Sequence, residues 1–226
     1  QPYLFPNLGF FQLLNVVDKF IIYDDVNYIK KGWINRNKIL VNGQEFMFTI
    51  PLKNVSQNTL IKDLELAITK KWQKKFMNTL EHAYKKAPYF ESVFPIVHDV
   101  VSVDSRYIKD WHLKSFELIK NYLSIDTKIV PTSKIYNNQK LKGQDRILDI
   151  CRKEKAHIYI NSSGGRDLYL HKKFEQEGIT LSFLNSRPVR YKQFKNEFVP
   201  HLSIIDIMMF NSASGIKKHL QSHIIN

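Results

Sequence analysis

The chain has 226 residues, and 43% hydrophobic and 13% aromatic residues are enough to fill a substantial core, which excludes a disordered protein. Its 34 Lys and Arg against 21 Asp and Glu give a formal charge of +13, which favours anionic partners such as phosphate, nucleotides, nucleic acid or an acidic membrane surface. A single cysteine, Cys151, excludes an intrachain disulfide and a cysteine-rich zinc site, and apolar runs far short of ~20 residues predict no membrane insertion, so we expect a cytoplasmic protein.

The N-terminal part of the chain predicts short elements joined by loops. The Pro-flanked segment 1–6 is typical of a loop, and we expect a first strand upstream of it. A short apolar helix is expected at 10–14, and a buried strand at 20–23.

An antiparallel hairpin is expected next. Residues 34–41 and 45–52 flank Asn42-Gly43, the strongest short-range hairpin signal in a sequence. Residues 59–68 partly alternate between apolar and polar and predict one more strand.

A helical insertion is expected at about 70–123. Apolar residues recur at three- and four-residue steps after Lys70, with lysines between them, and predict an amphipathic helix that ends at Pro88. A second helix is expected at 104–123, capped by Asp104 or Ser105. The lysine-rich face of the first helix could follow a nucleic-acid backbone, although such faces are more often simply solvated.

The C-terminal half predicts α/β architecture. An extended segment at 128–130 precedes a helix at 144–154. A strand at 157–160, a helix at 167–176 and a strand at 179–184 then make one βαβ unit, which requires at least two parallel strands.

The fold class that we predict is therefore α/β. We expect a single domain over residues 1–226, with a mixed sheet, a βαβ unit in the C-terminal half, an N-terminal β-hairpin and the helical insertion.

The first candidate site is the segment 23–37, which follows the strand at 20–23. Loops held by a rigid strand commonly carry binding and catalytic groups. Here the segment concentrates carboxylates, cations, aromatic rings and amides, namely Asp24, Asp25, Tyr28, Lys30, Lys31, Trp33, Asn35 and Arg36. Adjacent strand residues point to opposite faces, so we expect at most one of the two aspartates to reach a site. The alternative is a solvated hairpin with surface ion pairs.

The second candidate site is a glycine-containing turn after the strand at 157–160. It comprises Ser162, Ser163, Gly164, Gly165 and Arg166. Hydroxyls, free amides at a helix start and a guanidinium could cradle a phosphate. The turn matches neither the dinucleotide-binding fingerprint nor a Walker loop, and the alternative is a tight turn that needs glycine for its dihedral angles.

The third candidate is Asp206, in the apolar segment 198–211. A carboxylate in such surroundings needs a partner. Asp206 shares a helix face with Ser203, and it is either a structural hydrogen-bond acceptor or a catalytic group. No histidine pair has the spacing of a helical zinc motif, so we expect no metal, and no cofactor is indicated.

Taken together, several stretches of the sequence resemble the WbqC-like protein family. They run in order over essentially the whole chain: QPYLFPNLGFFQLL, DKFIIYDDVNYIKKGWINRNKIL with TIPL, KAPYF at 86–90, YINSSGGRDLY, and YKQF with FVPHLSIIDIMMFN.

The resemblance implies a cytoplasmic bacterial protein of O-antigen and other surface-polysaccharide (lipopolysaccharide) biosynthesis. It also implies transfer of glycine or another acyl group to an amino sugar. It assigns no catalytic residue, so the residues above are nominated from their chemistry.

The leading hypothesis is a transferase that forms an amide on a nucleotide-linked amino sugar. Asp24 or Asp25 would deprotonate the amine, Trp33 or Tyr28 would stack on base or sugar, and the turn at 162–166 would hold the diphosphate. The cations Lys30, Lys31 and Arg36 would neutralise phosphate or an oxyanion. The donor would be acyl or aminoacyl, and an aminoacyl-tRNA would also use the lysine-rich helix. The alternatives are a nucleic-acid-binding protein without catalysis and a non-catalytic nucleotide-sugar-binding protein.

Overall fold

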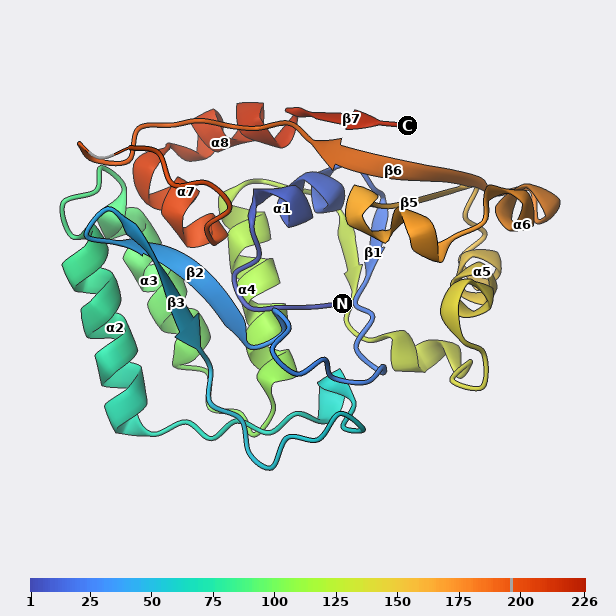
Figure 1. The fold of residues 1–226 in the computed structure, drawn as a ribbon, viewed down its shortest axis with the longest axis horizontal. Coiled ribbons are helices and arrows are strands. Elements are labelled where there is room, and N and C mark those ends of the chain that lie inside the picture. Colours follow the sequence, from blue (N-terminus) through green and yellow to red (C-terminus); the bar gives the residue numbers. More distant parts are fainter. Residues whose placement is uncertain (196) are drawn as a thin grey trace.

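The computed structural model describes residues 1–195 and 197–226 (Figure 1). Its α-helices are α1 (Leu8–Asn15), α2 (Lys70–Tyr84), α3 (Phe90–Val101), α4 (Ile108–Tyr122), α5 (Gly143–Lys153), α6 (His171–Gln176), α7 (Ile204–Phe210) and α8 (Ala213–Leu220). Its strands are β1 (Lys19–Ile21), β2 (Arg36–Val41), β3 (Gln44–Thr49), β4 (Lys128–Val130), β5 (Ile158–Ser162), β6 (Thr180–Ser186) and β7 (His223–Ile225). Short 3₁₀ helices are η1 (Ile61–Asp63), η2 (Ser133–Tyr136) and η3 (Ser163–Leu168).

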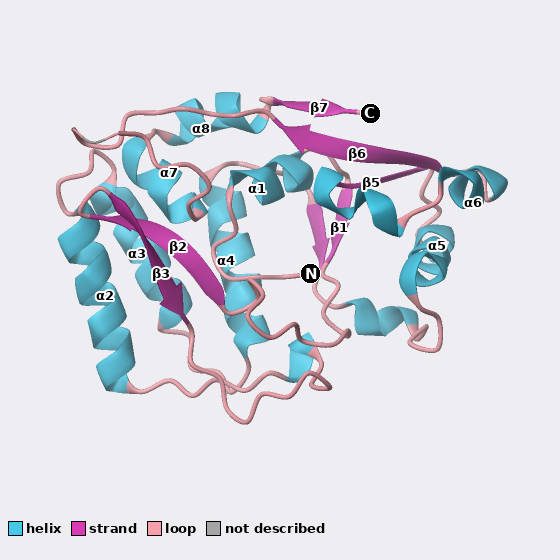
Figure 2. Cartoon of the chain, in the orientation of Figure 1, coloured by secondary structure: helices cyan, strands magenta, loops and turns pink. Residues whose placement is uncertain are grey.

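The strands form three small sheets, and parallel and antiparallel pairs occur together (Figure 2). β1 pairs in parallel with β4, and β2 pairs antiparallel with β3. In the third sheet β5 is parallel to β6, and β7 is antiparallel to β6. The predicted α/β class and the βαβ unit of the C-terminal half are confirmed.

The hairpin between β2 and β3 is confirmed, with its turn at Asn42-Gly43. Both turn residues have positive φ, 50° and 77°, as a two-residue hairpin turn requires. Val41 pairs with Gln44 across the turn, so the register follows directly from the turn.

The helical insertion contains three helices, so the prediction of two was wrong. The missed helix, α3, carries Pro95 in its interior, and a proline at that place conceals a helical pattern. The last helix begins at Ile108 and not at 104, because Ser105 Oγ accepts from Tyr107 N at 3.0 Å in the turn before it.

The strand expected at 59–68 is absent from the described structure. That segment contains η1 and touches its neighbours through isolated bridges, Asn27 with Leu60 and Leu52 with Leu66. The partial alternation of apolar and polar residues in this segment therefore reflects isolated bridges and not a continuously paired strand.

The helix expected at 167–176 is divided into η3 and α6. Tyr169 and Leu170 between them are extended, and Leu170 N donates to Gln144 Oε1 at 2.9 Å. This bond replaces a helical one, so the helix starts again at His171.

The main hydrophobic core joins α1, the hairpin, α2 to α4, α7 and α8. Two smaller apolar clusters lie around α5, β6 and β4, and are centred on Phe174 and on Tyr136. The single domain over 1–226 stays a prediction. Among the described helices, none combines the length and apolarity needed to cross a bilayer.

Candidate functional site

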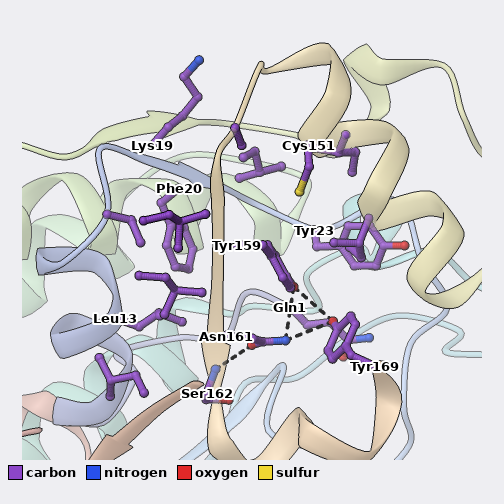
Figure 3. Close-up of a pocket in the computed structure, with 18 of the residues that line it drawn as sticks. Gln1, Leu13, Lys19, Phe20, Tyr23, Cys151, Tyr159, Asn161, Ser162 and Tyr169 are labelled. Atoms are coloured by element: carbon purple, nitrogen blue, oxygen red, sulfur yellow. Dashed lines mark hydrogen bonds between the residues drawn. The ribbon is translucent and has the colours of Figure 1, made fainter. Parts of the chain in front are cut away.

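A cleft of about 1350 Å³ opens between α1 and β1 on one side and α5 and β5 on the other (Figure 3). At one end it is bordered by Tyr23, which follows β1, by Ser162 and Ser163 at the end of β5, and by Gln1. We call this end the carboxyl-end mouth. In open α/β folds ligands commonly bind beyond the carboxyl ends of parallel strands, so the mouth is the candidate site.

A polar group formed by Tyr159 and Asn161 of β5 and by Tyr169, which follows η3, lines the cleft. Asn161 Nδ2 donates to the hydroxyl oxygens of Tyr159 at 3.2 Å and Tyr169 at 3.0 Å, and the two hydroxyls are 3.1 Å apart (Figure 3). Burial raises the pKa of Tyr159 well above its ordinary value, and the neighbouring Tyr169 adds to the effect. The Tyr159 ring therefore stays neutral and can offer its hydroxyl group to a ligand.

Asp25 is buried in an ion pair beside the mouth. Its Oδ2 accepts from Arg146 NH2 at 2.5 Å and from Gln139 Nε2 at 3.1 Å, and its Oδ1 accepts from the Ser133 hydroxyl. Burial alone would raise the pKa of Asp25, but the bonds from Ser133 and Arg146 outweigh it and hold the pKa below its usual value. Asp25 is thus charged and fully engaged, which makes it a poor base.

Asp24 is also buried but is less engaged. Its Oδ1 accepts from Thr132 Oγ1 at 2.7 Å and from Ser133 N at 3.2 Å. Within the described residues, Oδ2 has no side-chain donor. Burial raises the pKa of Asp24, although the bond from Thr132 opposes the shift. Of the two aspartates, Asp24 has the more basic carboxylate.

The two aspartates do not alternate as strand residues would. β1 ends at Ile21, before either of them, and both carboxylates turn to the connection between β4 and η2. The expectation that they point to opposite faces was wrong because it assumed a longer strand.

Arg146 connects its ion pair with Asp25 to the wall of the cleft. Its Nε donates to Asn138 Oδ1 at 2.9 Å, and its guanidinium lies 4.9 Å from the ring centre of Tyr23. Asn138 in turn donates to Asp149 Oδ2 at 2.7 Å. The buried ion pair therefore fixes an aromatic wall of the mouth.

Of the segment 23–37, Tyr23, Val26 and Ile29 line the cleft, whereas Asp24, Asp25 and the other residues do not. Tyr28 OH donates to Asn35 Oδ1 at 2.9 Å, and Asn35 Nδ2 donates to Ile50 O at 2.8 Å. Both side chains are buried, and these bonds hold the segment to the end of the hairpin.

The cations and the indole of this segment are directed away from the mouth. Lys30, Lys31 and Trp33 are exposed and do not line the cleft. Arg36 Nε donates to Gly32 O at 3.0 Å, which closes the segment on itself.

The second candidate site is only partly directed into the cleft. Ser162 and Ser163 line it, but Arg166 does not, because its NH2 donates to Asn226 Oδ1 at 2.9 Å and its guanidinium lies over Phe183. Neither Gly164 nor Gly165 has a positive φ. A requirement for positive φ therefore does not explain why glycine occupies these two positions.

We expect the two glycines to respond differently to alanine. A Cβ at Gly164 meets nothing within 4 Å, whereas one at Gly165 comes 3.3 Å from Asn161 Nδ2. Gly164→Ala should leave the melting temperature unchanged or slightly higher, and Gly165→Ala should lower stability by about 1 kcal/mol through the Asn161 bonds. Thermal denaturation of the matched variants measures this, and equal effects would contradict it.

Asp206 belongs to a separate buried network. Its Oδ1 accepts from Tyr84 OH at 2.8 Å, and its Oδ2 accepts from Tyr191 OH at 2.7 Å and Gln193 Nε2 at 2.6 Å. Tyr84 OH also accepts from Leu40 N at 2.8 Å. Burial raises the pKa of Asp206, and the bond from Tyr191 opposes the shift. The network joins α7, α2 and β2 and does not line the cleft.

Asp206→Ala is expected to lower the free energy of unfolding by about 3 kcal/mol or more, because two buried donors and one partly buried donor lose their acceptor. Chemical denaturation measures the change. Asp99→Ala, at an exposed carboxylate on α3, is the control and should change stability by less than about 0.5 kcal/mol. A loss for Asp206→Ala no larger than that of the control would show that the network does not support the fold.

Comparison with known proteins places the chain in a family. The WbqC-like protein family matches residues 1–218. The chain belongs to the WbqC-like protein family. It is also 25% identical over 231 residues to the uncharacterized protein Rv1507c of Mycobacterium tuberculosis (strain ATCC 25618 / H37Rv), which covers 96% of this chain and 93% of that protein. No solved structure matches.

In this WbqC-like protein, the partners of the aspartates were missed from the sequence. Thr132 and Ser133 come two and three residues after β4, the parallel neighbour of β1, so their position near the shared carboxyl edge was a usable signal. Arg146 lies on α5, one turn before the buried Ile150. A cation on a buried helix face needs an anionic partner, and that was a second signal.

No group of three or more His, Cys, Asp or Glu within residues 1–195 and 197–226 of this WbqC-like protein is arranged to hold a metal ion. The expectation of no metal cofactor stays a prediction.

Proposed function

We propose that the protein is a cytoplasmic transferase of bacterial surface-polysaccharide (O-antigen) biosynthesis that adds a glycyl or other acyl group to the amine of a nucleotide-linked amino sugar. The observation that carries the proposal is the carboxyl-end mouth, where an aromatic wall and hydroxyl groups border one cleft, and where the buried Asp24 directly follows the cleft-lining Tyr23 in the chain. Membership of the WbqC-like family supports the biosynthetic setting.

Binding would use the polar end of the cleft. Ser162 and Ser163 are exposed at the end of β5 and can donate to phosphate oxygens. The Tyr23 ring, held by Arg146, offers a flat surface for a sugar or a base. The net charge of +13 would draw an anionic substrate to the protein.

Asp24 is the carboxylate that we assign to proton transfer. The amine nitrogen forms the new C–N bond to the acyl carbon, the bond from that carbon to the donor's leaving group breaks, and the amine proton passes to Asp24. The raised pKa of Asp24 suits this role better than the lowered pKa of Asp25.

A second candidate function, binding of nucleic acid, is favoured by the basic face of α2. The four lysines of this helix and the two that follow it are exposed: Lys70, Lys71, Lys74 and Lys75, then Lys85 and Lys86. This face would also serve a transferase that takes its acyl group from an aminoacyl-tRNA.

The test is product analysis with the purified protein, nucleotide-linked amino sugars, and acyl or aminoacyl donors. An amide product that mass spectrometry detects supports the transferase. Thermal stabilisation by nucleotide sugar without product with any donor would indicate a non-catalytic nucleotide-sugar-binding protein. Salt-sensitive binding to generic RNA or DNA, with no response to nucleotide sugar, would indicate the nucleic-acid-binding function.

A further inference from the structure

Four large apolar side chains are exposed beside the carboxyl-end mouth. They are Ile29 after β1, Leu141 between β4 and α5, and Leu168 and Leu170 after β5. Their exposed fractions are 57%, 39%, 70% and 60%, so each presents a substantial part of its side chain to solvent. We call these four residues the apolar rim. Single exposed apolar residues are ordinary, but several around one opening indicate an interaction surface.

Contacts hold the members of the apolar rim around one opening. Ile29, Gln144 and Leu168 all line the cleft. Leu170 N donates to Gln144 Oε1 at 2.9 Å, and Leu141 comes three residues before Gln144. The apolar rim is therefore shared by the connections that follow β1, β4 and β5.

The two leucines after β5 are exposed because of the backbone between them. Tyr169 and Leu170 are extended, so neighbouring side chains in this stretch point in opposite directions. The Tyr169 hydroxyl accepts from Asn161 Nδ2 at 3.0 Å in the cleft, and Leu168 and Leu170 on either side of Tyr169 are left facing solvent. The exposure of both leucines therefore follows from a fixed contact of the residue between them.

Exposed lysines flank each part of the apolar rim, namely Lys30, Lys31, Lys140, Lys142 and Lys172. Within residues 1–195 and 197–226, none of these lysines forms an ion pair. The segments 29–31, 140–145 and 167–172 carry two carboxylates, Asp145, which pairs with Lys173 at 2.9 Å, and the exposed Asp167. The surface around the mouth therefore combines apolar side chains with an excess of positive charge.

We propose that the apolar rim and its flanking lysines dock the protein peripherally on the surface of an anionic lipid bilayer. The four apolar side chains would enter the boundary between headgroups and acyl chains, where their exposed surface leaves water. The lysines would bind the negatively charged headgroups, and the carboxyl-end mouth would face the bilayer. This docking is independent of the proposed transferase, because it uses neither Asp24 nor the serines at the mouth.

The chemistry of the apolar rim favours a bilayer over a nucleic acid or a second copy of the chain. A nucleic acid would engage the lysines, but bases stack on aromatic side chains, and all four members of the rim are aliphatic. A symmetric contact between two copies would bring the flanking lysines against the same lysines of the other copy. A fluid anionic surface accommodates both the apolar and the cationic groups without a matching shape.

The test is flotation of the full chain with vesicles of phosphatidylcholine, with and without phosphatidylglycerol. We expect binding to the vesicles that contain phosphatidylglycerol, and weaker binding as the salt concentration is raised. Leu168→Ser with Leu170→Ser should weaken this binding by about tenfold or more, and Lys140→Gln with Lys142→Gln should weaken it by a similar factor. All four side chains are exposed, so both variants should keep the native melting temperature.

Matched controls carry the same kinds of exchange at a distance from the apolar rim. Phe46→Ser with Met47→Ser removes two exposed apolar side chains from β3, and Lys71→Gln with Lys74→Gln removes two exposed lysines from α2. Figure 1 shows α2 at the opposite end of the molecule from α5. Attraction to headgroups falls off within a Debye length, so both controls should bind acidic vesicles within about twofold of the native chain.

Three outcomes would overturn the proposal. Absence of binding to acidic vesicles would show that the apolar rim does not dock on lipid. An equal loss in the rim variants and the controls would reduce the binding to general attraction by positive charge. Dimerisation in size-exclusion chromatography or RNA binding that the rim variants abolish, without vesicle binding, would assign the surface to a second copy or to a nucleic acid.

Discussion

Arg146→Met is expected to lower the free energy of unfolding by about 3–5 kcal/mol, because it leaves the Asp25 carboxylate charged and buried without its cation. The side chains of Arg146 and Asp25 are 4% and 0% exposed, so solvent cannot replace the lost partner. Asn138 and the Tyr23 ring lose their contacts at the same time. Urea denaturation followed by circular dichroism measures the loss.

Arg152→Met is the matched control on the same helix. Its guanidinium lies 3.6 Å from Glu177, and both side chains are substantially exposed, at 54% and 36%. An exposed pair of this kind contributes at most about 1 kcal/mol. Similar losses for Arg146→Met and Arg152→Met would contradict the view that the buried pair holds the mouth together.

The ion pair between Asp25 and Arg146 also makes the stability of the fold depend on pH, and the pKa of Asp25 gives the sign. The pKa of Asp25 is lowered on folding, so its contribution to stability is present above the ordinary aspartate pKa of about 4 and is lost as pH falls through the folded value. The raised pKa of Asp24 acts in the opposite direction, because its ionised form is disfavoured by burial.

The fold was predictable where local chemistry decides it. Asn42-Gly43 specified the hairpin, and the alternation of strand, helix and strand after His157 specified a parallel pair. The errors occurred where tertiary contacts override local signals. Pro95 lies inside a helix that packs on its neighbours, and the contact from Gln144 divides η3 from α6.

The sequence could nominate a segment for the site but not its contacts. The density of polar groups after β1 predicted a site in the segment 23–37, yet sequence could not show that Tyr28 and Asn35 bond to each other while Trp33 faces solvent. Asp206 shows the same limit, since a buried carboxylate was expected but its donors come from distant parts of the chain. Which polar groups share a space is decided by packing.

Asp24→Asn is expected to lower the turnover number of the proposed transferase by about 10²–10⁴-fold, because the amide cannot accept the proton of the attacking amine. The amide oxygen can still accept from Thr132 and Ser133 N, so the fold and the ligand affinity should be retained. Steady-state kinetics with calorimetric binding measures both quantities. Because the pKa of Asp24 is raised, the rate of the native protein should rise with pH through a value above the ordinary aspartate pKa, and the variant should lack that rise.

Asp18→Asn is the control for this variant, since Asp18 is an exposed carboxylate that lines the cleft beside the start of β1, away from the mouth. It should leave turnover within about twofold of the native rate, as expected for a carboxylate that takes no part in proton transfer. Asp25→Asn is unsuitable as a control because it breaks the pair with Arg146 and changes stability. If Asp24→Asn keeps a native turnover number and pH profile, the proton is accepted elsewhere, and the hydroxyl groups of Ser162 and Ser163 become the groups to test.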